Sequence, residues 1–264
     1  MVDYQRHINI AQLWSTIKSE ARQDAQQYEQ LAGLLERTLL QADSFAEALA
    51  NILAHQLVMP PDMQQVTAWQ GAIGAIYKAK PQLIAAAEAD LLCQLQSNAA
   101  IKDHYTPLLY FGGFHALQCY RLAHDYWQQG ELPMANYIQA RMVEKFGVDI
   151  HPAAQLGKGI FMDHAVGIVI GETARVEDRV TLFQGVTLGG TGKGSGDRHP
   201  KIRQGAFIGC GAQILGNIEI GAGAKVGAGA IVVQPVAAGT TVLGTAAKVL
   251  NNKTGGKYEE SSWH

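Results

Sequence analysis

The chain of 264 residues is poor in cysteine, in long apolar runs and in charge of one sign. Its three cysteines, Cys93, Cys119 and Cys210, are scattered and form no CxxC pair, which argues against a disulfide framework or a zinc–thiolate site and fits a reducing cytoplasm. No apolar stretch approaches the roughly 20 residues that span a bilayer. Residues 1–14 lack the apolar core and cleavage site of a signal peptide. We therefore expect a cytoplasmic protein without a membrane partner.

The charge balance also bears on which partners to expect. The formal net charge is −2 and no long basic run occurs, so electrostatics give no reason to expect nucleic acid as a partner. The ligands are better sought in a local pocket than in the overall field.

Glycine divides the chain into two parts. Of the 29 glycines, 21 lie between Gly147 and Gly244, whereas the first 145 residues have the caps and apolar spacing of helices. Ser44 and Glu47 resemble a capping box, Pro60-Pro61 ends the helix that follows, and proline stands at the start of others. The expected helices cover residues 48–58, 62–80, 81–97, 106–129 and 133–146.

From residue 150 the apolar residues recur every six positions. A helix requires a period of 3.6 and a strand a period of 2, so neither explains this pattern. A hexapeptide repeat does, in which short strands and turns stack as a parallel β-helix with the apolar residue of each hexad inside. The thirteen positions are Ile150, Leu156, Met162, Ile168, Ala174, Val180, Val186, Ile202, Ile208, Ile214, Ile220, Val226 and Val232.

The repeat is interrupted once, at residues 192–201, which read GKGSGDRHPK. A polar, glycine-rich excursion from a rigid repeat is a favourable place for a binding or catalytic loop. The alternative is a disordered insertion, against which the charged and imidazole side chains of Asp197, Arg198 and His199 argue.

Several stretches together resemble the serine acetyltransferases, a branch of the hexapeptide-repeat acyltransferases. They are TPLLYFGGFHALQCYR (106–121), DIHPAA (149–154), MDHAVGIVIGET (162–173), VTLGGTGKGSGDRHPKI (186–202) and IGCGAQILGNIEIGAGAKVGAGA (208–230). The resemblance implies an α+β protein: an all-helical domain (1–145), a left-handed parallel β-helix (146–248) that carries the loop 192–201, and a C-terminal tail (249–264). It also implies a homotrimer, with the helical domains pairing two trimers into a hexamer.

The chemistry implied is transfer of acetyl from acetyl-CoA to the hydroxyl of L-serine, the first step of cysteine biosynthesis. A hydroxyl attacking a thioester needs a base and an oxyanion donor, and histidine with an orienting carboxylate is a suitable base. His164, His199, Asp149 and Asp163 are candidates in the repeat region. The alternative is that the histidines pack at coil corners and the carboxylates satisfy turns.

The resemblance implies a role for each of these residues. His164 is the general base and Asp149 orients it, while His199 assists at the serine hydroxyl. Arg198 binds the substrate carboxylate, Asp163 and Asn98 lie near its ammonium group, and the N–H of Gly190 is a candidate oxyanion donor. No acyl-enzyme and no metal are implied. Acetyl-CoA lies between adjacent β-helices, where the expected contacts are Gly190, Gly192, Ala212, Gly229, Ala230 and Lys248.

Two departures from the family's pattern change these expectations. The family has aspartate where this chain has Asn98, so we expect weaker inhibition by L-cysteine, the feedback inhibitor that the resemblance implies. Relatives that dock into O-acetylserine sulfhydrylase end in isoleucine, whereas this chain ends in His264. We therefore expect weak or absent docking.

Three other functions fit the repeats. The first is a carbonic anhydrase with zinc held by His151, His164 and His199. The second is a β-helix that serves only in assembly, and the third is an acetyltransferase for another hydroxylated acceptor, such as homoserine or a sugar. The loop and the base–carboxylate pair argue against the first two, and an acceptor screen separates the third.

Overall fold

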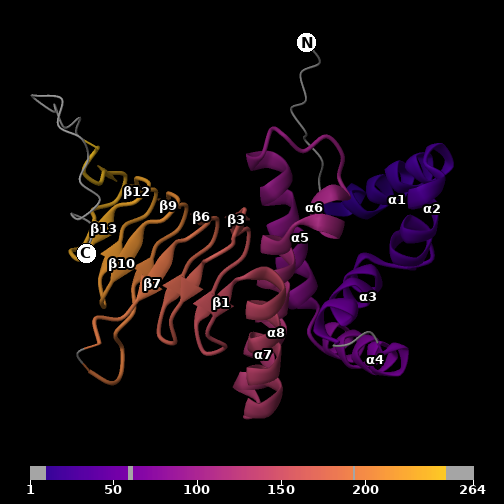
Figure 1. Cartoon of the computed structure of the whole chain (residues 1–264), viewed down its shortest axis with the longest axis horizontal. Helices are drawn as coiled ribbons and strands as arrows, with labels where there is room; N and C mark the ends of the chain where they lie inside the picture. Colours follow the sequence, from indigo (N-terminus) through magenta and orange to yellow (C-terminus); the bar gives the residue numbers. More distant parts are fainter. Residues whose placement is uncertain (1–9, 59–61, 193, 248–264) are drawn as a thin grey trace, which may run out of the picture.

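The computed structural model describes residues 10–58, 62–192 and 194–247 (Figure 1). Helices form the first half of this part of the chain and a stack of short parallel strands forms the second, which confirms the predicted fold class. None of the described helices is long and apolar enough to cross a bilayer. The helices are α1 (Ile10–Gln27), α2 (Glu29–Leu35), the π-helix η1 (Glu36–Leu40), α3 (Phe45–Leu57), α4 (Met63–Ala79), α5 (Pro81–Ser97), α6 (Thr106–Tyr110), α7 (Gly112–Gln128) and α8 (Leu132–Phe146).

Local capping rules explain where several helices begin. The Ser44 side chain accepts a hydrogen bond from the N–H of Glu47 at the start of α3, and the Glu47 carboxylate accepts from the N–H of Asp43. Asp62 caps α4 in the same way, and Pro81 occupies the first turn of α5. These three starts confirm the sequence prediction. Pro60 and Pro61 lie outside the described residues.

One predicted helix is wrong. Residues 106–129 were expected to form a single helix, but the backbone leaves the helical region at Phe111 and separates α6 from α7. The first turn of α7, which follows this break, makes a close approach to another part of the chain at Gly113. A Cβ atom there would lie 2.4 Å from the carbonyl oxygen of Met162 and 2.9 Å from the Cβ of Ala165. Only glycine allows the start of α7 to sit against the first coil of the β-helix.

The strands form three parallel sheets that are the faces of a triangular prism. The orders are β1-β4-β7-β10-β13 in the first sheet, β11-β8-β5-β2 in the second and β14-β12-β9-β6-β3 in the third. The stack lies at the left of Figure 1, and α5, α7 and α8 stand between it and α1 to α4. The strands are β1 (Asp149–Ile150), β2 (Gln155–Leu156), β3 (Phe161–Asp163), β4 (Val169–Ile170), β5 (Arg175–Val176), β6 (Thr181–Phe183), β7 (Thr187–Gly189), β8 (Lys201–Ile202), β9 (Phe207–Ile208), β10 (Gln213–Leu215), β11 (Glu219–Ile220), β12 (Lys225–Val226), β13 (Ile231–Val232) and β14 (Thr241–Val242).

Twelve of the thirteen predicted hexad positions are buried, and Leu156 is partly buried against the core. The register of the strands reveals one corner of unusual length, which the period of six does not show. Ile150 pairs with Ile170 rather than with Ile168, although Ile170 pairs with Leu188 at the usual spacing of eighteen residues. The corner between β3 and β4 is therefore two residues longer than the usual corner. The period of six continues because both Ile168, just before β4, and Ile170, within it, point into the core.

A buried ion pair joins the helices to the first coil. The carboxylate of Asp90 in α5 accepts hydrogen bonds from Arg121 and Gln118 of α7 and from the N–H of Ile160 in the β-helix. Arg121 also donates to the carbonyl oxygen of Gly157. Asp90 is completely buried and Arg121 nearly so. The pair therefore fixes the orientation of the helices on the coil.

Replacing Asp90 with asparagine is expected to destabilise the protein. The amide group would turn a donor toward groups that are themselves donors, and the buried Arg121 would lose its counter-charge. Breaking a buried pair in this way costs roughly 3–5 kcal/mol, which a urea unfolding curve measures. Asp62→Asn is the matched control, because asparagine caps a helix about as well as aspartate does. Equal stability of the two variants would contradict this role for Asp90.

Candidate functional site

The longer corner between β3 and β4 carries two of the predicted site residues, Asp163 and His164. His164 and Ala165 both have positive φ, 58° and 60°. The N–H of Ala165 donates to the oxygen of Asp163 and that of Val166 to the oxygen of His164, so each bond closes a three-residue turn centred on a left-handed residue. This form of turn is rare and strained. It turns the His164 side chain outward, where 74% of it is exposed.

The carboxylates lie close to this corner. Asp163 Oδ1 lies 3.8 Å from His164 Nε2. Asp149, at the start of β1, has its backbone N–H bonded to the carbonyl of Ile168, just beyond the corner. Its carboxylate accepts a hydrogen bond of 2.7 Å from Gln139 of α8. In this structure the carboxylate nearest to His164 is thus Asp163, and Gln139 holds Asp149 beside the same corner. We call Asp149, Asp163 and His164 the His164 edge.

The loop lies on another edge of the prism. It leaves the first sheet after β7 and rejoins the second at β8, below β7 in Figure 1. The His164 corner instead joins the third sheet to the first. Because a triangular prism has three separate edges, His164 and His199 of one chain lie on different edges. We call the residues Gly190, Gly192, Arg198 and His199 the loop edge.

Arg198 is held by contacts that the sequence did not reveal. Its guanidinium group donates to Glu172 Oε2 (2.8 Å) and to the carbonyl of Gly196 (3.1 Å). The hydrogen bond from Arg198 lowers the pKa of Glu172. Gly190 lies beneath the Arg198 side chain, since a Cβ atom there would be 3.4 Å from Arg198 Cγ. The loop therefore directs a cation toward the end of β7.

Thr173 and Gly171 fix His199. The Thr173 hydroxyl accepts hydrogen bonds from the N–H groups of Arg198 (3.0 Å) and His199 (3.1 Å) and lies 2.9 Å from His199 Nδ1. The His199 ring lies on Gly171, where a Cβ atom would be 2.0 Å from Cδ2 and Nε2. Only 7% of His199 is exposed, and its burial, followed by the charge of Arg198, lowers its pKa. Sequence reasoning gave neither Gly171 nor Thr173 a role.

The residues predicted to contact acetyl-CoA differ in how exposed they are. Gly192 and Gly229 are exposed, and Gly190 is half-buried. Ala212 and Ala230 are buried inside the coils, and their carbonyl oxygens accept strand hydrogen bonds. Their side chains occupy inward positions of their hexads, so the predicted contact with acetyl-CoA falls to their backbone. Lys248 lies outside the described residues.

Asn98 has a local role in this structure. It ends α5, and its side-chain oxygen accepts a hydrogen bond of 2.9 Å from the N–H of Ala100. No contact joins it to His164 or to His199 within the described part of the chain.

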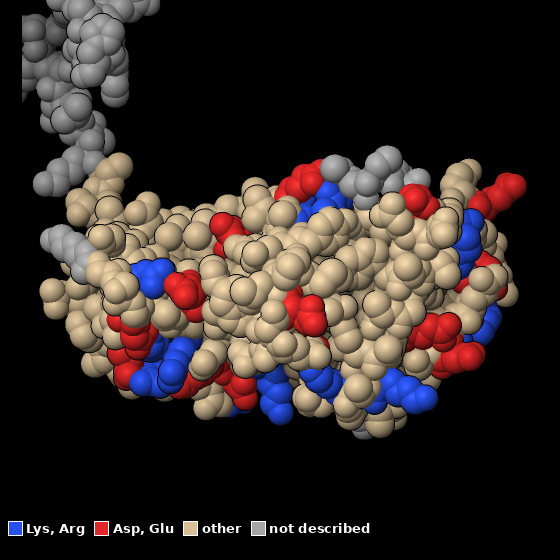
Figure 2. Space-filling view, turned by 90° about the horizontal axis from the view of Figure 1, so that it is seen from below, with Lys and Arg blue, Asp and Glu red and all other residues tan. Residues whose placement is uncertain are grey.

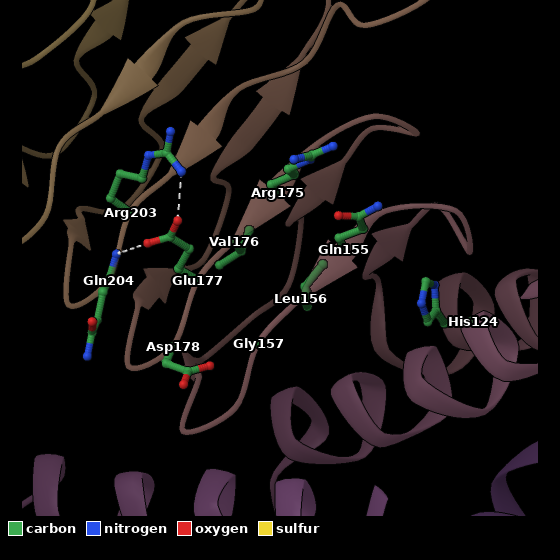
Figure 3. A pocket seen from close by; sticks show the side chains of 10 residues that line it. All are labelled: His124, Gln155, Leu156, Gly157, Arg175, Val176, Glu177, Asp178, Arg203 and Gln204. Atoms are coloured by element: carbon green, nitrogen blue, oxygen red, sulfur yellow. Dashed lines mark hydrogen bonds and ion pairs between the residues drawn. The ribbon is translucent and has the colours of Figure 1, made fainter. Parts of the chain in front are cut away.

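A hollow outside these two edges carries none of the predicted site residues. It has a volume of about 530 Å³ and lies on the second sheet beside His124 (Figure 3), where Arg203 pairs with Glu177 and Glu219. On the face drawn in Figure 2, acidic and basic side chains are interspersed and neither sign forms a continuous field. The two edges, rather than this hollow, carry the chemical groups.

Comparison with known proteins agrees with this arrangement. Two family models match the chain: "Serine acetyltransferase, N-terminal" at residues 13–119 and "Bacterial transferase hexapeptide (six repeats)" at residues 199–234. The serine acetyltransferase of Salmonella typhimurium is 48% identical over 238 residues, which are 90% of this chain and 86% of that protein.

Solved structures of serine acetyltransferases superpose on the chain. One in complex with cysteine has a TM-score of 0.86 at 42% identity and covers 92% of this chain and 93% of its own. That of Brucella abortus with coenzyme A has a TM-score of 0.85 at 42% identity (89% and 94% covered). Soybean serine acetyltransferase with serine has 0.84 at 43% identity (90% and 97% covered).

The stacked hexads and the matching repeat model define a transferase of the hexapeptide-repeat class. Within that class, the helical half and the similarity over nine-tenths of the length are decisive. The chain belongs to the serine acetyltransferase family, whose members move an acetyl group from acetyl-CoA to the hydroxyl of serine.

Proposed function

We propose that the acetyl transfer takes place between two protomers, where the His164 edge of one faces the loop edge of the next. The observation that supports this is the separation of the two groups on different edges of one prism. A cyclic trimer of parallel β-helices brings unlike edges together three times. We propose the trimer as the catalytic unit and pairing of two trimers through the helical domains as the full assembly.

His164 is the general base in this proposal. Its exposed ring takes the proton of the serine hydroxyl as the oxygen forms a bond to the thioester carbon. The tetrahedral intermediate then collapses, the carbon–sulfur bond breaks, and the imidazolium returns the proton to the leaving sulfur. O-acetyl-L-serine and CoA are the products, and no acyl-enzyme forms. Asp149 and Asp163 stabilise the charged ring, with Gln139 positioning Asp149.

The substrate's own charges fit the two edges. The Arg198 guanidinium group, held by Glu172, binds the serine carboxylate, for which its planar fork is suited. Asp163 lies beside His164 and receives the ammonium group, with Asn98 as the more distant polar neighbour. The N–H of Gly190 has no hydrogen-bond partner among the described residues, so it is free to donate to the oxyanion.

Acetyl-CoA enters along the groove between protomers in this arrangement. A coenzyme A complex of a close structural relative supports it as the acetyl donor. Gly190, Gly192 and Gly229 present backbone without side chains there, and Lys248 is proposed to meet a CoA phosphate. The reaction sequence requires no metal. We place the enzyme in the cytoplasm.

A screen of acceptors tests this function. With acetyl-CoA and the purified full chain, release of free thiol is expected with L-serine and at a much lower rate with homoserine, threonine or simple sugars. The reason is that Arg198 and Asp163 recognise the two charges of an amino acid, and the extra methylene or methyl group displaces the hydroxyl. Turnover of a sugar in preference to serine would overturn the proposal.

The same assay tests control by cysteine. Cysteine has the ammonium and carboxylate groups of serine, and a relative has been solved with cysteine bound. We expect millimolar cysteine to raise the apparent KM for serine and leave kcat unchanged, with weaker inhibition than in relatives that have aspartate at position 98. Replacing Asn98 with aspartate should then lower the inhibition constant. Unchanged serine turnover in millimolar cysteine would contradict this proposal.

A further inference from the structure

The hydrogen bonds around His199 determine which of its ring nitrogens carries the proton. The backbone N–H of Thr173 donates to His199 Nδ1 at 3.2 Å. A backbone N–H can only donate, so Nδ1 must accept. A neutral imidazole carries its single proton on the other nitrogen when one nitrogen is an acceptor.

The Thr173 hydroxyl is compatible with the same assignment. Its oxygen accepts from the N–H groups of Arg198 and His199, so its two lone pairs are used and its own hydrogen remains to be donated. His199 Nδ1 lies 2.9 Å away. The carboxylate of Asp197, whose pKa is lowered by hydrogen bonds from Lys201 and from Thr173, is a second acceptor for this hydrogen. The backbone N–H of Thr173 thus fixes Nδ1 as an acceptor, and the hydroxyl beside it is a second donor that Nδ1 shares with Asp197.

The ring cannot relieve this by turning over. A flip would place the Cδ2–H group against the backbone N–H of Thr173 and leave this donor without its acceptor, which costs roughly 1–3 kcal/mol for an unsatisfied buried group. The ring packs directly against the backbone of Gly171, where a side chain would leave it no room. Nε2 has no hydrogen-bond partner among the described residues, so its N–H group remains available to a ligand.

We propose that His199 works as a neutral hydrogen-bond donor through Nε2–H, and that Thr173 is the positioning residue that fixes this tautomer. The proposal rests on the acetyl transfer proposed above and assigns His199 one part of it. A nitrogen that already bears a proton cannot accept the proton of serine. His199 instead donates to the thioester oxygen as it becomes negative, beside the N–H of Gly190, and keeps its own proton throughout. His164 is then the only base of the pair.

The surroundings of His199 keep its ring neutral. Arg198 and Lys201 add positive charge nearby, and burial disfavours the imidazolium; both effects lower its pKa, while Glu172 opposes them. His151, the other histidine near it, acts in the same direction as Arg198. The lowered pKa favours the neutral ring that the hydrogen bonds require.

Nitrogen-15 spectra of the full chain labelled at histidine test the tautomer without any turnover. We expect an unprotonated Nδ1 and a protonated Nε2 for His199, assigned by its absence from the His199→Gln variant. Thr173→Ser should keep this spectrum, and Thr173→Val, which removes one of the two donors, should add signals of the Nδ1–H form. A His199 whose Nδ1 carries the proton in the unmodified protein would overturn the proposal.

Kinetics of three variants test the donor role. Glutamine can place its amide N–H close to the position of Nε2–H, whereas asparagine is too short and alanine has no donor. His199→Ala and His199→Asn should each lower kcat by about 10²–10³-fold, as loss of an oxyanion donor does. His199→Gln should have a kcat at least tenfold higher than that of His199→Ala. If glutamine is as poor as alanine, His199 is not a donor, whereas failure of the His164 base alone would leave the spectra and this order unchanged.

Discussion

Replacing His164 with alanine is expected to lower kcat/KM for serine by about 10²–10⁴-fold, the usual loss when a positioned general base is removed. The side chain is exposed on a corner and makes no buried contacts, so the melting temperature and the oligomeric state should not change. Steady-state thiol release, with the assembly checked by light scattering, measures both.

Two companion variants show whether this loss comes from the base. Asp149→Asn should cost less than His164→Ala, because the imidazole remains and loses only part of its orientation. His55→Ala, which removes another exposed histidine in α3, should leave activity unchanged. A His164→Ala enzyme that turns over at a near-normal rate would refute the assignment.

Replacing Gly171 with alanine is expected to lower activity by about 10²-fold although it replaces no reacting group. The new methyl group would stand 2.0 Å from the His199 ring, so the ring must leave its place on the coil and release the two hydrogen bonds to Thr173. A displacement of about 1 Å of a catalytic group is enough for such a loss. The effect should fall on kcat, because the donor is needed in the transition state.

Gly221→Ala is the matched control for this prediction. A Cβ atom there would lie 2.4 Å from the backbone nitrogen of Ala238, which is a clash with main chain of the next coil. Because this clash is with main chain and lies on a different edge of the prism from the loop, Gly221→Ala should lower the melting temperature, while Gly171→Ala changes mainly activity because the nearest atoms it meets belong to the His199 side chain. Full activity of Gly171→Ala, with the His199 spectrum unchanged, would contradict the proposed position of the ring.

The repeat made most of the fold predictable. Apolar residues at a period of six can be buried together only in stacked coils, and the helix starts at Asp62 and Pro81 followed from capping chemistry alone. The break at Phe111 was not predictable in this way. It adjoins the contact between Gly113 and Met162, which lie far apart in the sequence, and a local pattern holds no information on such a contact.

The site was predictable in its residue types but not in its geometry. The sequence indicated two histidines. The six-residue repeat, however, conceals that one corner of the prism is two residues longer than the others and that the two histidines occupy different edges. The sequence did not reveal that the side chains of Ala212 and Ala230 point inward, because small residues suit both a groove and a narrow interior. Thr173 was missed because a threonine at a turn is ordinary until the loop folds back over it.

The loop of the third coil also has a consequence for how such a protein can change over time. Partners on either side of it, Val176 and Ile202, still pair in register although the intervening chain is eight residues longer than in a plain coil. Lengthening a corner costs little free energy, because loop closure becomes only about 0.6 kcal/mol less favourable for each doubling of length. Insertions at a corner can therefore be gained or lost during evolution with little effect on the stability of the stacked coils. A solenoid of this kind can thus acquire a new acceptor specificity while its framework remains the same.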